Sequence, residues 1–174
     1  MGLFKKLFGR KSPIAQPPRP EPQFVPELQG NERRARPRRD APEGTKVLII
    51  DDSPTIGAAL RKILRSAGYV TLEALDAEHG IELLQEHKPS IIFLDIVLPG
   101  MNGFAALRAI RRDVATRDIP VIMMSGNEQA TEQFFGTRIG ADDFMKKPFS
   151  RFEVFARIER LLDEELHPRR VITR

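Results

Sequence analysis

The sequence predicts an α/β domain built on a doubly wound, five-stranded parallel sheet, and three observations lead to this fold class. Five short apolar runs typical of strands alternate with five helical stretches between residues 46 and 166. Runs such as Ile91–Leu94 are continuously apolar, as in strands covered on both faces of a sheet. Residues that favour helix starts and stops stand between the runs. We expect right-handed crossovers between the strands.

Each expected strand is short and precedes its own helix. The strands are expected at residues 46–51, 70–74, 90–95, 120–125 and 142–146. The helices are expected at 54–67, 76–87, about 103–112, about 128–138 and 150–166. Gly68 follows the first helix, Pro89 follows the second, and Ser150 with Glu153 forms a capping box for the last.

Three further segments flank the domain at residues 46–166. Residues 1–12 form a short basic stretch with Leu3, Phe4, Leu7 and Phe8 on one helical face. Residues 13–45 are rich in proline and arginine and lack an apolar period, so we expect a disordered linker there. Residues 167–174 are a C-terminal tail, too short for an effector domain.

Composition narrows the classes of function. The chain has no cysteine, which excludes disulfides and thiolate metal sites. No apolar run approaches the roughly 20 residues that a spanning helix needs, and no signal peptide is evident, so we expect a cytoplasmic protein.

The net charge of +4 resides in the N-terminal segment. There, residues 1–11 could lie on the anionic inner membrane, with a solvated tail as the alternative. We expect no specific nucleic-acid binding, because "RRARPRR" has no interleaved aromatic residue.

Polar residues stand where the expected strands end. Asp51 and Asp52 follow the first strand, and Asp95 ends the third. Ser125 ends the fourth and Lys147 follows the fifth. Ligands of open α/β sheets bind outside the carboxyl ends of the strands. These residues are therefore the candidate site.

The residue types at this edge favour phosphoryl chemistry. If the first and third strands are neighbours, three carboxylates converge, and their repulsion favours a bound cation. Oxygen ligands suit Mg²⁺ or Mn²⁺, and no histidine lies at these strand ends to favour zinc. Lys147 and Ser125 would hold the oxygens of a phosphoryl group. A carboxylate acceptor would then form an aspartyl phosphate.

Four segments in order, "LIIDDSPTI", "IIFLDIVLPGMNGF", "PVIMMSG" and "GADDFMKKPF", resemble the receiver domain of response regulators over residues 46–166. The resemblance implies the CheY-like, flavodoxin-like (βα)5 fold with strand order 2-1-3-4-5. It makes Asp95 the phosphoacceptor, with Ser125 and Lys147 as phosphate-binding residues. Metal ligands would come from Asp51, Asp52, Asp95 and the backbone carbonyl of Val97. It also implies that Phe144 is the switch aromatic, which turns inward when Ser125 moves to the phosphoryl group, and that the peptide bond before Pro148 is cis.

The same resemblance implies a single-domain response regulator rather than an enzyme. A histidine kinase or phosphotransfer protein would donate the phosphoryl group, and a protein target would bind the face at about residues 128–166. Within the family, "IDDSPTI" is similar to stand-alone, PilG-like regulators of twitching and chemotaxis-type motility. A phosphate sink without output, or a membrane-tethered adaptor that uses the domain as a scaffold, are the alternatives. A dehalogenase-type phosphatase would need an aspartate where Val97 stands, and a flavodoxin would not place Asp51 and Asp52 beside its phosphate loop.

Overall fold

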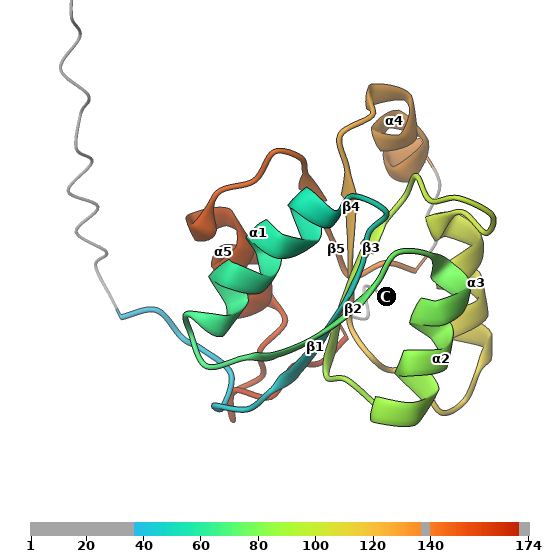
Figure 1. Ribbon diagram of the computed structural model, residues 1–174. Helices are drawn as coiled ribbons and strands as arrows, with labels where there is room; N and C mark the ends of the chain where they lie inside the picture. Colours follow the sequence, from blue (N-terminus) through green and yellow to red (C-terminus); the bar gives the residue numbers. More distant parts are fainter. Residues whose placement is uncertain (1–36, 137–139, 171–174) are drawn as a thin grey trace, which may run out of the picture. The chain divides into compact units, whose positions relative to one another are not determined.

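The structure is a computed structural model, and it describes residues 37–136 and 140–170 (Figure 1). Five strands alternate with five helices in these ranges. The strands are β1 (Lys46–Ile50), β2 (Val70–Ala74), β3 (Ile91–Asp95), β4 (Val121–Ser125) and β5 (Asp143–Lys146). The helices are α1 (Pro54–Arg65), α2 (Ala77–His87), α3 (Gly103–Arg112), α4 (Glu128–Gly136) and α5 (Arg151–Arg160). The predicted alternation is confirmed.

The strands form one parallel sheet in the order β2-β1-β3-β4-β5, which confirms the predicted topology. β1 lies between β2 and β3, and Ile50 is in register with both Ala74 and Leu94. The residues that follow Ile50 and Leu94 therefore leave the sheet at the same edge. This register places the Asp51–Asp52 pair beside Asp95.

Helices cover both faces of the sheet, as the apolar strands predict (Figure 1). Alternate residues of a strand point to opposite faces. Phe93 accordingly packs in a core with α1 and α5, while Leu94 packs in a second core with α2 and α3. Phe134 of α4 packs against the second core. The sheet thus lies between two separate apolar layers. The polar residues at the carboxyl ends of its strands remain for the candidate site.

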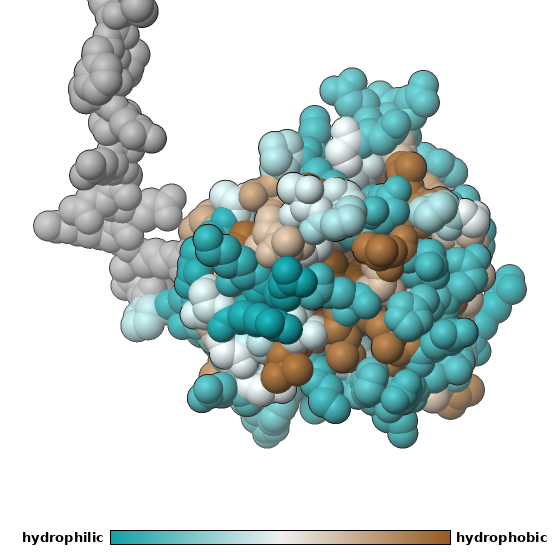
Figure 2. Space-filling model, in the orientation of Figure 1, coloured by the Kyte–Doolittle hydropathy of each residue, from teal (hydrophilic) through white to brown (hydrophobic). Residues whose placement is uncertain are grey.

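The surface is mostly polar on the face that Figure 2 presents, where apolar residues show as separate patches. No helix within residues 37–136 and 140–170 is long and apolar enough to cross a membrane.

Residues 37–45 pack on the domain, although the sequence predicts a linker as far as residue 45. Ala41 is buried, and its N–H donates a hydrogen bond of 3.1 Å to the hydroxyl of Tyr69. The guanidinium of Arg38 lies 3.8 Å from the centre of the Phe155 ring on α5, within the range of a cation–π contact. Arg39 donates to the carbonyl of Asp163. The folded unit therefore includes this segment, which covers part of the α1 and α5 side.

Tyr69→Phe is expected to lower the free energy of unfolding by about 1–3 kcal/mol, because the buried N–H of Ala41 would lose its acceptor. Urea denaturation of the two proteins measures the difference. Thr45→Ala is the matched control, since its exposed hydroxyl donates to a carbonyl of the same turn, and we expect a change within about 0.5 kcal/mol. Equal stability of Tyr69→Phe and the unaltered protein would contradict the packing of this segment.

The last helix ends at Arg160 rather than at the predicted residue 166. The Asp163 carboxylate accepts hydrogen bonds from the N–H groups of Glu165 and His167, which competes with helical hydrogen bonding. Leu162 then pairs with Pro168 in an isolated antiparallel bridge. The chain after α5 therefore folds back on the domain.

A buried ion-pair cluster fastens the returning chain. Asp142 accepts from Arg111 of α3 at 2.7 Å and from Arg170 at 3.2 Å, and its side chain is fully buried. The N–H of Val121 donates to the same carboxylate. Burial lowers the pKa of Arg111 to about 10, while Asp142 opposes that decrease. The start of β5 is thus tied to α3 and to the chain beyond α5.

Candidate functional site

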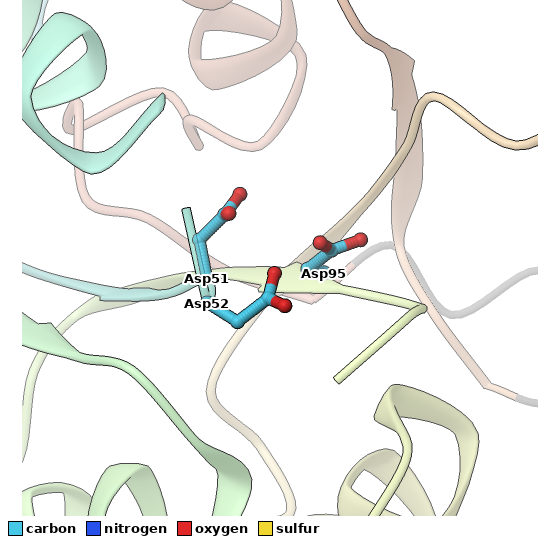
Figure 3. A group of neighbouring side chains, drawn as sticks. All are labelled: Asp51, Asp52 and Asp95. Atoms are coloured by element: carbon cyan, nitrogen blue, oxygen red, sulfur yellow. The ribbon is translucent and has the colours of Figure 1, made fainter. Parts of the chain in front are cut away.

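Three carboxylates meet at the carboxyl edge of the sheet (Figure 3). Asp51 and Asp52 follow β1, and Asp95 ends β3. One oxygen of each lies within 4.8 Å of one oxygen of the other two. Asp51 and Asp95 are buried, whereas Asp52 is exposed to solvent. The convergence predicted from the neighbouring strands is therefore present.

Backbone geometry fixes the two buried carboxylates. The N–H of Asp51 donates to the carbonyl of Ala74, which extends the β1–β2 pairing by one residue. Asp51 Oδ1 then accepts from the N–H of Ser53, the residue that caps α1. Asp95 Oδ1 accepts from the N–H of Val97 at 3.2 Å. Each carboxylate thus presents its second oxygen to the site.

Lys147 places its ammonium between these second oxygens. Its Nζ atom lies 2.6 Å from Asp95 Oδ2 and 2.6 Å from Asp51 Oδ2. The approach to Asp95 is a hydrogen bond, which identifies Lys147 rather than the exposed Lys146 as the lysine of the site. The peptide bond between Lys147 and Pro148 is cis, as the family resemblance implies.

The site fits a cation. Asp51 Oδ2 forms an ion pair with Lys147 Nζ but has no hydrogen-bond donor among the described residues. The same ammonium is shared with Asp95, so neither carboxylate has this positive charge to itself. The three carboxylates also outnumber the one ammonium. Hard oxygen ligands in this number are those that Mg²⁺ prefers.

The pKa of Asp95 is raised above its ordinary value, chiefly because burial disfavours the charged carboxylate. The hydrogen bond and the charge of Lys147 lower this pKa, the charge of Asp51 raises it further, and the N–H of Val97 lowers it. The effect of burial on this pKa exceeds the opposing effects of Lys147 and Val97. Asp95 is therefore a carboxylate whose negative charge costs folding free energy.

Asp95→Asn is expected to stabilise the metal-free protein at neutral pH by about 0.5–2 kcal/mol. A carboxyl whose folded pKa is raised destabilises the fold when it is ionised. The advantage of asparagine should shrink as the pH falls through the raised pKa, and vanish below the ordinary aspartate pKa of about 3.9. Thermal unfolding in a chelator across this pH range measures it. Asp118→Asn, at an exposed carboxylate, should change little, and a less stable Asp95→Asn protein at neutral pH would contradict the account.

The remaining predicted site residues are Ser125, Phe144 and Val97. Ser125 is fully buried, and its hydroxyl bonds to the backbone of Asn127, accepting from the N–H at 3.0 Å and donating to the carbonyl at 3.3 Å. Phe144 is 8% exposed and packs in the core on the α2 and α3 side. Val97, the expected carbonyl ligand, is half exposed in the loop after β3.

Gly103 has a role at the site that its sequence context does not reveal. Gly103 is the first residue of α3, and its N–H donates to the carbonyl of Ile96 at 2.9 Å. A Cβ atom at this position would lie 2.1 Å from the carbonyl oxygen of Asp95. Gly103 therefore lets α3 start directly against the backbone of the candidate phosphoacceptor. The "MNGF" sequence shows a glycine near a helix start but gives no sign of this close approach.

Comparison with known proteins agrees with this geometry. The family profile of the response regulator receiver domain matches residues 47–159. Protein PilH of Pseudomonas aeruginosa is 40% identical over 103 residues, which cover 59% of this chain and 85% of PilH. The phosphate regulon transcriptional regulatory protein PhoB of P. aeruginosa is 37% identical over 119 residues. That match covers 68% of this chain but only 52% of PhoB, so the chain spans about half the length of this relative.

Solved structures show the same fold. The chemotaxis protein CheY4 of Vibrio cholerae superposes with a TM-score of 0.63 and 27% identity, over 68% of this chain and 99% of CheY4. The receiver domain of the sensor histidine kinase PA1611 of P. aeruginosa has a TM-score of 0.61 and 28% identity, over 67% of this chain and 95% of that domain. That structure has a magnesium ion coordinated in its active-site cleft. The fold, the family profile and the acidic cluster together show that the chain belongs to the response regulator receiver domain family.

Proposed function

We propose that the chain is a single-domain response regulator whose Asp95 accepts a phosphoryl group from a phosphohistidine of a kinase or phosphotransfer protein. The observation that carries the proposal is the contact of Lys147 Nζ with Asp95 Oδ2 at 2.6 Å, beside two further carboxylates. The ammonium marks a place where the oxygens of a phosphoryl group would be bound next to the attacking carboxylate. Membership of the receiver family supports the same reading.

In the proposed step, an oxygen of the Asp95 carboxylate attacks the phosphorus atom of the donor. A P–O bond forms, the P–N bond of phosphohistidine breaks, and the imidazole leaves with a proton from solvent. Lys147 binds an equatorial phosphoryl oxygen, and the Ser125 hydroxyl donates to another after leaving Asn127. Asp51, Asp52, Asp95 and the Val97 carbonyl would hold Mg²⁺, or Mn²⁺, which supplies charge neutralisation when bound. The chain would assist only its own phosphorylation and dephosphorylation.

The output in this proposal is a protein contact. The target would bind the face made by α4, β5 and α5, and phosphorylation of Asp95 would change how well this face binds it. The likeness to PilH supports a role in twitching or chemotaxis-type motility. We place the protein in the cytoplasm and propose that residues 1–11, which lie outside the described residues, contact the inner membrane.

Intact-mass measurement tests the proposal. The protein is incubated with Mg²⁺ and acetyl phosphate, and we expect a gain of about 80 Da for one phosphoryl group. The gain should disappear when a chelator replaces Mg²⁺, because the acidic cluster would then lack its cation. Absence of any adduct in the presence of Mg²⁺ would overturn the proposed function.

A further inference from the structure

Three phenylalanines connect α4 to β5 and form what we call the phenylalanine cluster: Phe134, Phe135 and Phe144. The rings of Phe134 and Phe144 are stacked, with centroids 4.8 Å apart and planes inclined by 28°. Phe135 sets its ring edgewise against both, at 5.2 Å from Phe134 and 5.4 Å from Phe144. Both arrangements are geometries that aromatic pairs favour.

The cluster has a buried pair and an exposed outer ring. Phe144 is 8% exposed, and Phe134 is partly buried against the same apolar core. Phe135 is 70% exposed. The inner contact between Phe134 and Phe144 is therefore the one that can hold a side chain in place, because it is largely shielded from water.

The Phe144 ring and the Ser125 hydroxyl are not in the combination that the family resemblance implies. The family resemblance couples an inward switch ring to a hydroxyl that has turned to the phosphoryl group. Here the Phe144 ring is buried while Ser125 Oγ bonds to the N–H and the carbonyl of Asn127. Burial of the ring therefore depends on contacts other than Ser125, and the stacked Phe134 ring is the partly buried aromatic contact among them.

The backbone on the β5 side of this contact is held by charged residues. Asp142 is bound by Arg111 and Arg170, and Asp143 accepts from Arg157 of α5 at 3.0 Å. These two residues immediately precede Phe144 in the chain. These ion pairs hold the backbone of β5 next to the residue that carries the Phe144 ring.

We propose that Phe134 is a positioning residue that holds Phe144 buried whichever partner the Ser125 hydroxyl takes. The inference rests on the proposed function and extends it: when Asp95 is phosphorylated and the Ser125 hydroxyl turns to the phosphoryl group, the Phe144 ring stays buried against Phe134. Phe144 has no hydroxyl to favour an outward position by hydrogen bonding, so packing on Phe134 decides where the ring lies.

The test is NMR spectroscopy of the full chain, labelled at its phenylalanine rings, without any phosphodonor. A soluble paramagnetic agent broadens the signals of exposed rings and spares those of buried rings, so the broadening reports burial of Phe144 and not the ring current of Phe134. We expect Phe144 signals that stay sharp with this agent in the unaltered protein, in Phe134→Tyr, which keeps the ring, and in Ser125→Ala. Phe134→Leu keeps an apolar side chain without the ring, and should lower the ratio of buried to exposed Phe144 about threefold to tenfold.

Phe135→Leu is the matched control, because it removes a ring of the same cluster that is exposed. Its Phe144 signals should stay closer to those of the unaltered protein than the Phe134→Leu signals do. Unchanged signals in Phe134→Leu, equal changes in the two leucine variants, or release of the ring by Ser125→Ala alone would each overturn the inference. Backbone amide spectra show whether each variant is folded. Because no phosphodonor is used, these results are independent of the mass gain that tests phosphoryl acceptance.

Discussion

Gly103→Ala is expected to lower the free energy of unfolding by about 3 kcal/mol or more, the largest loss we expect from adding one methyl group at the site. The new Cβ would lie 2.1 Å from the Asp95 carbonyl oxygen, 2.8 Å from Ile96 Cα and 2.9 Å from the Asp95 carbonyl carbon. All three obstacles are backbone atoms, so no side-chain rotation can relieve the overlap. Either α3 or the end of β3 must move.

Because the obstacle is the backbone of Asp95, the same substitution should also impair phosphoryl acceptance in the fraction that folds. Gly126→Ala is the matched control, since a Cβ there would meet its nearest neighbour, the Lys147 Cβ, at an ordinary 3.5 Å. Urea denaturation of both variants gives the comparison. A Gly103→Ala protein as stable as Gly126→Ala would contradict the close packing of α3 on the site.

Asp52→Asn is expected to weaken Mg²⁺ binding at least about tenfold while leaving the metal-free fold nearly unchanged. Asp52 is the exposed member of the acidic cluster, so its charge contributes little to folding and is directly accessible to a hydrated cation. For the unaltered protein, Mg²⁺ at 100 times its dissociation constant should add about 2.7 kcal/mol to the free energy of unfolding. With a dissociation constant about tenfold higher, Asp52→Asn should keep only about 1.4 kcal/mol, or about half of this gain, at the same Mg²⁺ concentration.

Thermal unfolding over a series of Mg²⁺ concentrations measures the effect. Asp118→Asn serves as a control for the loss of one exposed negative charge away from the cluster, and it should keep the full response to Mg²⁺. If Asp52→Asn responded to Mg²⁺ as strongly as Asp118→Asn does, the ion would have to bind elsewhere, and the assignment of the acidic cluster would be wrong.

The fold followed from patterns that local sequence carries. Continuous apolar strands such as Ile91–Leu94 can only be buried on both faces, and helices between them supply the cover. The C-terminal end of the last helix shows where local patterns in the sequence do not suffice. Residues 161–166 keep a helical apolar pattern, but Asp163 binds the backbone N–H groups of Glu165 and His167 and ends the helix earlier.

The contacts that sequence did not predict join residues distant in the chain. Asp142 binds Arg111 and Arg170, which lie 31 and 28 positions away, and nothing near Asp142 indicates either partner. Arg38 likewise contacts a residue far along the chain, the ring of Phe155. The sequence before β1 gives no sign of this contact, and it therefore resembles a linker. At the site, charged residues at strand ends could be found from the sequence, whereas the need for Gly103 could not, because it arises only when α3 meets the end of β3.

Asp95, and neither Asp51 nor Asp52, should carry the phosphoryl group. Peptide mass mapping after incubation with Mg²⁺ and acetyl phosphate tests it most directly, with Asp95→Asn treated in parallel. We predict a gain of about 80 Da on the peptide that contains Asp95, and no gain on any peptide of the Asp95→Asn protein. A phosphoryl group on the peptide that contains Asp51 and Asp52, or an adduct that survives Asp95→Asn, would contradict the account.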